Sequence, residues 1–151
     1  MNDRTELTLT LEDHQRAFSE VSFLLEILVA TASQVVGDSA PVLGTAAGRH
    51  MAKKLPIYLD HPTLDGVLQA QAQTLGAGFE IKHSADDKGA DVTFGRCALR
   101  DVCGNRKLEV GAELCKMFHH YQAGMAAELF GRPVRATIKS AGATCVVRLQ
   151  S

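Results

Sequence analysis

The 151-residue chain contains no tryptophan, and its 16 basic and 17 acidic side chains nearly cancel. The resulting net charge of −1 provides no bulk attraction for nucleic acid or for an anionic membrane. No apolar run reaches the ~20 residues that span a bilayer, because Glu26 interrupts the longest stretch, VSFLLEILVATA. The first residues also lack the basic-then-apolar order of a secretory signal. We therefore expect a cytoplasmic protein with no membrane span and no direct contact with nucleic acid.

Catalytic motifs are equally scarce. The chain shows no set of nucleophile, base and acid and no glycine-rich phosphate loop, and its GAGFE stretch lacks the strand-then-helix context of a dinucleotide site. The paired carboxylates of Asp86 and Asp87 lie in a predicted hairpin turn, where Asp is common. These absences favour binding or sensing over catalysis, and we assign no catalytic residue.

The first helix is expected over residues 11–37. Thr10 and Asp13 form a capping signal, and Gly37 is a stop signal. Its apolar band is wide enough to need cover on more than one side, which a second copy would supply. We therefore predict an isologous homodimer through residues 11–37. The helical spacing is carried by Phe18, Val21, Leu24, Leu25, Leu28, Ala32 and Val35, and Phe23, Ile27 and Val29 widen the band.

Further helices are expected between Pro41 and Pro56, after Pro62, and within EVGAELCKMFHHYQAGMAAELFG. Apolar alternation predicts one hairpin over residues 79–97, turning at DDKG, and a second over residues 133–149, turning at residues 140–143. The sequence therefore predicts a single α+β domain, in which N-terminal helices precede two hairpins that form a small antiparallel sheet packed with a long helix.

Four cysteines are the main candidates for chemistry. Their spacing, C-x5-C-x11-C-x29-C, contains no C-x-x-C, so four thiols that only pack in the core are an alternative to a metal site. Cys97 ends a predicted strand, Cys115 begins a helix and Cys145 lies in the last strand, so the hairpins can bring them together. Cys103 is placed in the polar loop DVCGNRK, where a thiol without a partner would be exposed to oxidation. His119, one helical turn after Cys115, is an alternate ligand, although a packing or surface role is open for it too.

Between Cys97 and Leu149, the stretches CALRDVC, ELCKMFHHYQAGMAAELFGRPVR and G-x-x-C-x-x-R-L resemble the C-terminal effector region of the SufR-type iron–sulfur repressors. With the stretches LGTAAGRHMAKKL and LDGVLQAQAQTLGAGFEI upstream, the resemblance covers residues 43–150. It implies a [4Fe-4S] cluster held by three cysteines, which match Cys103, Cys115 and Cys145 here, with Cys97 as a candidate fourth ligand. Thiolates suit such clusters and zinc alike.

The same order of elements looks, more distantly, like the vinyl-reductase-type small-molecule-binding domain. That likeness implies a dimer through the N-terminal helix and a small hydrophobic or tetrapyrrole-like ligand. Many members carry a zinc site with a Glu and a Cys shortly before the final Cys, but VRATIKSAGATC offers neither, so that site is not carried over. A pocket is expected between the hairpin of residues 79–97 and the helix after it, lined by Met117, Phe118, Tyr121 and Met125.

Residues 1–42 hold one long apolar helix where the repressors carry a winged helix-turn-helix. We interpret residues 1–42 as a dimerisation region and residues 43–151 as an effector-like core, whose output would need a separate protein partner. Two functions are favoured, and a catalytic role, the third alternative, would have to come from the metal or from a thiolate. The first is a metal- or iron–sulfur-binding sensor or cofactor-handling protein that uses Cys97, Cys103, Cys115 and Cys145, with His119 as alternate ligand and zinc as the other metal. The second is a small-molecule-binding module in which the cysteines are secondary.

Overall fold

A computed structural model describes residues 8–151 of the chain. The strands form one antiparallel sheet in the order β1-β2-β4-β3. This arrangement of helices and one small sheet confirms the predicted α+β class. In chain order the elements are α1 (Leu11–Val36), a 3-10 helix (Gly37–Ser39), α2 (Ala40–Ala52), α3 (Leu64–Thr74), β1 (Phe79–Asp86), β2 (Gly89–Cys97), α4 (Ala98–Arg106), α5 (Glu113–Phe130), β3 (Arg135–Ser140) and β4 (Cys145–Gln150).

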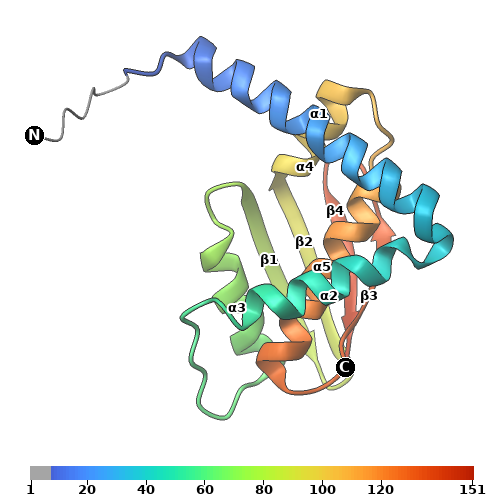
Figure 1. Cartoon of the computed structure of the whole chain (residues 1–151). Helices are drawn as coiled ribbons and strands as arrows, with labels where there is room; N and C mark the ends of the chain where they lie inside the picture. Colours follow the sequence, from blue (N-terminus) through green and yellow to red (C-terminus); the bar gives the residue numbers. More distant parts are fainter. Residues whose placement is uncertain (1–7) are drawn as a thin grey trace, which may run out of the picture.

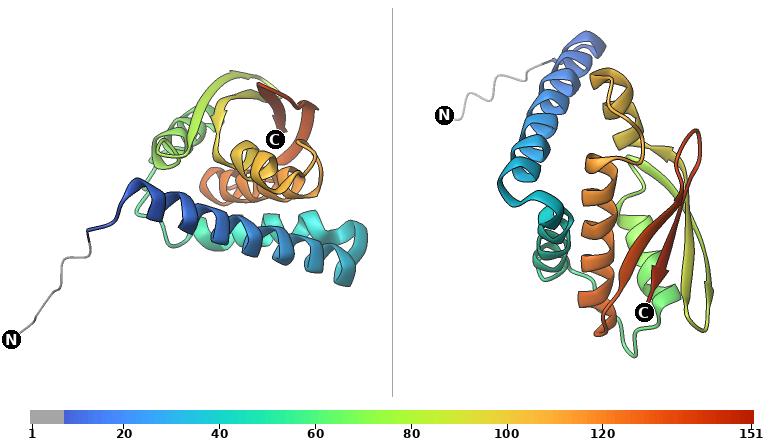
Figure 2. Two further views of the ribbon diagram at one scale, coloured as in Figure 1. Left: turned by 90° about the horizontal axis from the view of Figure 1, so that it is seen from above. Right: turned by 90° about the vertical axis from the view of Figure 1, so that its right-hand side faces the viewer.

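Helix α5 lies in the middle of the molecule, between α2 on one side and the inner face of the sheet on the other (Figure 2). Helix α3 packs beside it against β1. Helix α1 crosses the outside of the molecule and passes α4 and the start of α5 (Figure 1). The two ends of α5 are therefore covered differently, and the end that carries Cys115 lies under α1.

The inner face of the sheet follows the two-residue period expected of strands with one buried face. Val92 and Phe94 on β2 and Val147 and Leu149 on β4 are completely buried. Their neighbours in the sequence point outward, among them Arg148, which joins a network of charges on the open face. The hydrophobic core thus lies between the sheet, α3 and α5.

Helices α2 and α5 are in backbone contact along a line of glycines. A Cβ atom at Gly44 would overlap the carbonyl oxygen of Met117, and one at Gly48 would overlap that of Tyr121. From the other helix, Gly124 approaches the carbonyl of Thr45 in the same way. Only glycine permits this approach, because any side chain would push the two helices apart. Helix α2 is therefore fixed firmly to α5.

Helix α1 is held much more loosely. Its predicted start is confirmed, since Thr10 and Asp13 form a reciprocal capping box, and it ends at Gly37, whose φ is 57°. Ser22 and Val29 are its only described residues that are fully buried. A stripe of apolar side chains on α1 faces outward instead, and we call it the α1 stripe: Phe18, Val21, Leu24, Leu28 and Val35.

The helical stretch Leu11–Ala52 is long and apolar enough to cross a membrane by length and composition, with a hydropathy of 1.4 in its most apolar window. The sequence prediction considered uninterrupted runs and did not anticipate this result. Glu26 within the stretch is paired with Arg106 on α4 at 2.6 Å. A single such helix near the N-terminus is weak support for a membrane segment, although only 11% of its most apolar window is buried, unlike the core helix of a soluble protein.

Candidate functional site

The four cysteines lie where β2 ends, β4 begins, and α4 and α5 start. Cys97 is the last residue of β2, and Cys145, the first of β4, lies opposite Phe94 in the ladder. Cys103 belongs to α4 and Cys115 to the first turn of α5. All four thiols are free and buried.

The prediction of a polar loop around Cys103 is wrong, because residues 98–106 form helix α4. Leu99, Val102, Cys103 and Arg106 recur at helical spacing, which turns Val102 and Cys103 toward the core. The polar residues that suggested a loop lie on the outer side, and Cys103 is 0% exposed. Burial therefore shields the Cys103 thiol from oxidation, and it needs no ligand for that purpose.

Burial raises the pKa of the Cys103 thiol to about 12, and the neighbouring thiol of Cys115 adds to this shift, as do Cys97 and Cys145 more weakly. These contributions place all four sulfur atoms in one electrostatic neighbourhood. Burial also raises the pKa of Cys97, against the opposing influence of Arg100. Cys97 and Cys103 therefore carry protonated thiols at neutral pH.

Arg100 is a member of this neighbourhood that the sequence analysis missed. Its Nη2 lies 3.6 Å from the Cys145 sulfur, and its Nη1 donates to the Gly95 carbonyl at 2.8 Å. A cation beside the sulfur atoms favours their charged form. The signal for Arg100 was its position three residues after Cys97, within the first turn of a helix that was not predicted.

The four thiols match a soft metal or an iron–sulfur cluster in donor type. Across residues 8–151, however, no group of three or more His, Cys, Asp or Glu side chains is arranged to hold a metal ion. His119 packs against Phe94 and Phe118, with ring centroids 5.1 Å and 5.3 Å away. The four cysteines therefore match a metal site in donor type but not in spatial arrangement.

His119 is instead part of a buried polar group in the otherwise apolar core. It is 5% exposed, and burial lowers its pKa to about 4, an effect that the adjacent side chain of Gln122 opposes only in part. Gln122 and Gln71 are completely buried, and the Gln71 amide donates to the Gln122 carbonyl at 3.1 Å. Among residues 8–151, the Gln71 Oε1, the His119 Nδ1 and both amide atoms of Gln122 have no partner within hydrogen-bonding geometry, although the Gln122 side chain is near enough to His119 to raise its pKa. We call these three residues the interior polar cluster.

A groove of 650 Å³ reaches one member of this cluster, His119, from the surface, whereas Gln71 and Gln122 do not line it. It runs between α5, the edge strand β3 and the segment before α5, and His119 is part of its wall. Lys116 and His120 from α5 and Thr137 from β3 also line it. The groove therefore gives a small molecule a route to the neutral imidazole of His119.

The pocket expected between the first hairpin and α5 is filled by aromatic rings. Phe79 stacks on Phe118 at 4.9 Å, and Phe94 meets Phe118 edge-on at 6.2 Å. Met117, Phe118 and Tyr121 line a cavity on the opposite side of α5, facing α1 and α2. The fourth expected residue, Met125, is 1% exposed and packs in the core. The prediction named three lining residues correctly but placed the pocket on the wrong side of the helix.

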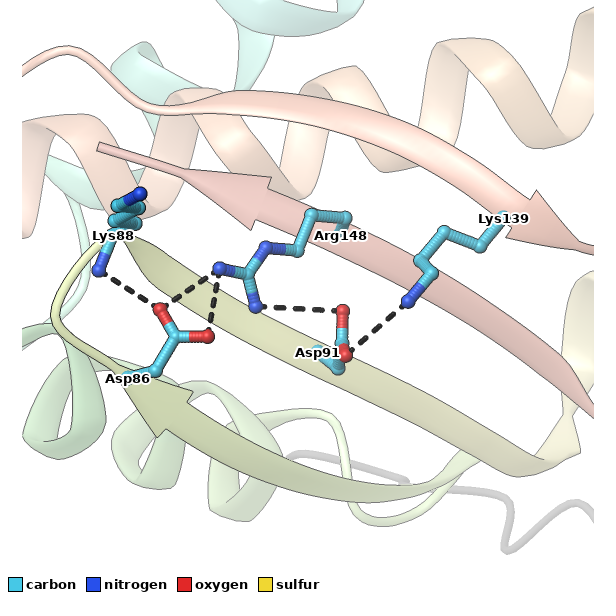
Figure 3. Close-up of polar contacts among 5 residues, drawn as sticks. All are labelled: Asp86, Lys88, Asp91, Lys139 and Arg148. Carbon is cyan, nitrogen blue, oxygen red and sulfur yellow. Dashed lines mark hydrogen bonds and ion pairs between the residues drawn. The ribbon is translucent and has the colours of Figure 1, made fainter.

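The open face of the sheet carries a chain of ion pairs (Figure 3). Arg148 lies between Asp86, at 2.8 Å, and Asp91, at 3.6 Å, and Lys139 reaches Asp91 at 3.4 Å. The backbone N–H of Lys88, followed by Arg148, holds the pKa of Asp86 below its usual value. Both carboxylates are held in ion pairs, and Asp86 ties Arg148 to the hairpin turn.

The described residues thus define an α+β domain with a buried polar cluster beside a surface groove. Among solved structures, a similar fold is that of the phenol-responsive sensory domain of the transcription activator PoxR, determined with phenol. The likeness has a TM-score of 0.60 at 16% identity and covers 88% of this chain and 73% of that one. No protein-family model and no curated protein matches the sequence.

Proposed function

We propose that this protein is a small-molecule-binding module of the sensory type, located in the cytoplasm. The interior polar cluster carries the proposal. Buried donors and acceptors without a partner cost roughly 1–3 kcal/mol each, and proteins normally avoid them. His119 and Gln122 bring three such atoms to one stretch of α5, beside a groove that is open to solvent. A bound molecule with its own hydrogen-bonding group would satisfy them.

The ligand that suits this cluster is small, neutral and largely apolar, with one or two hydrogen-bonding groups. An imidazole with a pKa of about 4 is uncharged at neutral pH, so it can accept or donate a hydrogen bond but cannot neutralise an anion. The apolar part of such a ligand would lie against Val110, Ala136 and Ile138, which line the groove beside His119. The fold shared with a phenol-responsive sensory domain supports the same class of ligand.

The test is calorimetric titration with phenol and, for comparison, toluene, which has the same ring without the hydroxyl. We expect phenol to bind the wild type and the His119→Phe variant to bind it at least roughly tenfold more weakly, because one hydrogen bond is lost. His50→Phe, an exposed change on α2, is the matched control. Equal phenol affinity in the wild type and in His119→Phe would contradict this assignment. Mass spectrometry of the purified protein tests for a ligand that co-purifies.

We further propose that the module is a homodimer joined through the α1 stripe. The stripe is long, apolar and exposed, and no Lys or Arg lies between residues 17 and 48 to attract an anionic membrane. A second copy of α1 offers the matching surface in an isologous contact. Light scattering at micromolar concentration should give the dimer mass for the wild type and the monomer mass for Leu28→Glu. A monomeric wild type would refute the proposal.

A second candidate function is the binding of a thiophilic metal or a [4Fe-4S] cluster by Cys97, Cys103, Cys115 and Cys145. It is supported by the gathering of four free thiols beside the cation of Arg100. The thiols would have to lose their protons and draw closer together, since the arrangement of the described residues holds no metal. Anaerobic metal analysis of the wild type beside Cys115→Ser tests it, with absorption near ~400 nm expected for a cluster. Metal-free wild-type protein would exclude this function.

A further inference from the structure

The cavity on the far side of α5 from His119 supports an inference of its own. Its volume is 360 Å³, and it lies between α1, α2 and α5. Helix α1 contributes Leu25 and Val29, helix α2 contributes Leu43 and Ala47, and helix α5 contributes Met117 and Tyr121. Phe118 takes part in its wall and also in the aromatic packing beside His119, so one ring separates the two sites.

The cavity exists because the three helices approach one another unequally. The glycines Gly44 and Gly48 allow α2 to lie directly on the backbone of α5. Helix α1 has no such contact and rests on α5 through Val29 and Leu114, which pack together in a small cluster. A second cavity, of 240 Å³, lies on the other side of this same contact. Helix α1 therefore contacts α5 over a narrow area, and a cavity lies on each side of this contact.

The walls of the larger cavity select for an uncharged apolar molecule. None of its lining residues carries a charge, so an ion entering it would lose its hydration without gaining a partner. The hydroxyl of Tyr121 is the only one among the lining side chains, and burial raises the pKa of this phenol, which keeps it neutral. The volume lies within the range of small-ligand sites and is smaller than one turn of a helix about 10 Å wide.

We propose that this cavity is a second binding site, distinct from the His119 site, for a small hydrocarbon-rich molecule with at most one hydroxyl group. Such a ligand fills the space beside Val29 and contacts Met117, and its hydroxyl meets Tyr121. Helix α1 forms the outer wall of the site, so occupancy strengthens the attachment of α1 to the rest of the domain.

The test uses 1-N-phenylnaphthylamine, a neutral apolar dye whose fluorescence rises on transfer from water, together with protein labelled at the methionine methyl groups. Saturable dye binding and a shift of the Met117 methyl resonance are expected. Met125 is the internal control, because it is buried but does not line the cavity. A wild type that shows neither dye binding nor a shift at Met117 overturns the proposal.

Two matched substitutions on α2 locate the site. Ala47→Trp places an indole in the cavity and should weaken dye binding at least roughly tenfold, whereas Ala46→Trp, at an exposed position outside the lining, should leave it unchanged. Equal weakening by both variants, or by neither, overturns the assignment. His119→Phe should retain dye binding, so the experiment tests this site independently of the His119 site. Dye binding that appears only in the Leu28→Glu monomer would identify a partner side chain as the natural occupant and would also overturn the proposal.

Discussion

Arg106 on α4 and Glu26 on α1 form an ion pair in which the Nε and Oε2 atoms are 2.6 Å apart. The same guanidinium lies 4.9 Å from the centre of the Phe23 ring, so a single side chain makes two contacts with α1. Both partners are largely buried, with side-chain exposures of 30% and 26%. In a helix with only two fully buried residues, this attachment matters more than it would in a well-packed one.

We expect Arg106→Met to lower the free energy of unfolding by about 1–3 kcal/mol, because Glu26 then loses its partner while remaining partly buried. Amide exchange along α1 should accelerate more than exchange in the core helix α5. Arg132→Met is the control, since Arg132 lies over a ring, that of Phe130, but on the exposed surface. Chemical denaturation and hydrogen exchange measure the two effects. Uniform acceleration in α1 and α5 would show that Arg106 does not act as a local anchor.

Replacing glycine by alanine is expected to have opposite effects at Gly48, in the contact between α2 and α5, and at Gly104, in α4. Gly48→Ala should destabilise the protein by at least about 1–3 kcal/mol, because the new methyl group would overlap the Tyr121 carbonyl and force the helices apart. Gly104→Ala should stabilise it by about 0.5–1 kcal/mol, since Gly104 lies in helix α4 with nothing within 4 Å of the new methyl group. Denaturant midpoints compare the two. A neutral Gly48→Ala would mean that α2 can move away from α5 without loss.

Most of the elements could be predicted from periodicity and from their end signals. The capping residues Thr10 and Asp13 and the turn at residues 86–89 are where the sequence put them. Helix α4 was missed because its nine residues include Gly104 and Asn105, which favour loops. Its inward-facing residues also repeat at helical spacing over only a short stretch. Helix α2 ends at Ala52, before Pro56. A proline sets the farthest point to which a helix can extend, and the helix can end earlier.

The candidate site was harder to predict because it depends on contacts between distant segments. The cysteine positions could be read from the sequence, but whether Cys103 is exposed depends on α1 lying over α4. His119 was considered as a ligand on account of Cys115, whereas its environment is set by Phe94 and by Gln122. A buried amide oxygen without a partner among the described residues, such as Gln71 Oε1, has no sequence signature, because Gln is ordinary on a helix surface.

Protonation of His119 should make stability depend on pH. Burial lowers its pKa from 6.5 to about 4, so the unfolded chain binds the proton more tightly than the folded one. The stabilising contribution of the neutral imidazole is therefore complete above about pH 6.5 and is lost as the pH falls toward about 4, amounting to on the order of 3 kcal/mol. The unfolding free energy of the wild type should therefore fall relative to that of His119→Phe as the pH is lowered through this window. A difference that stays constant with pH would place the pKa of His119 near its normal value.

The four cysteines provide a test that separates protonated, packed thiols from thiolates ready to bind a metal. With a pKa of about 12, the Cys103 thiol is ionised in only about one molecule in 10⁴ at about pH 8, and its side chain is inaccessible. We expect iodoacetamide to modify none of the four cysteines in the native apo protein and all of them in guanidinium, as counted by mass spectrometry. Cys97 should be the first to react on mild destabilisation, because the charge of Arg100 favours its ionised form.

The Arg100→Met variant makes the role of that cation measurable. If Arg100 favours ionisation of Cys97, the variant should alkylate more slowly at Cys97 than the wild type at the same degree of unfolding, while Cys115, on the first turn of α5, should be unaffected. Rapid modification of any cysteine in the folded wild type would contradict the picture of a closed, protonated cluster. It would instead favour a thiolate site that is already prepared for metal, and so would bear directly on the second candidate function.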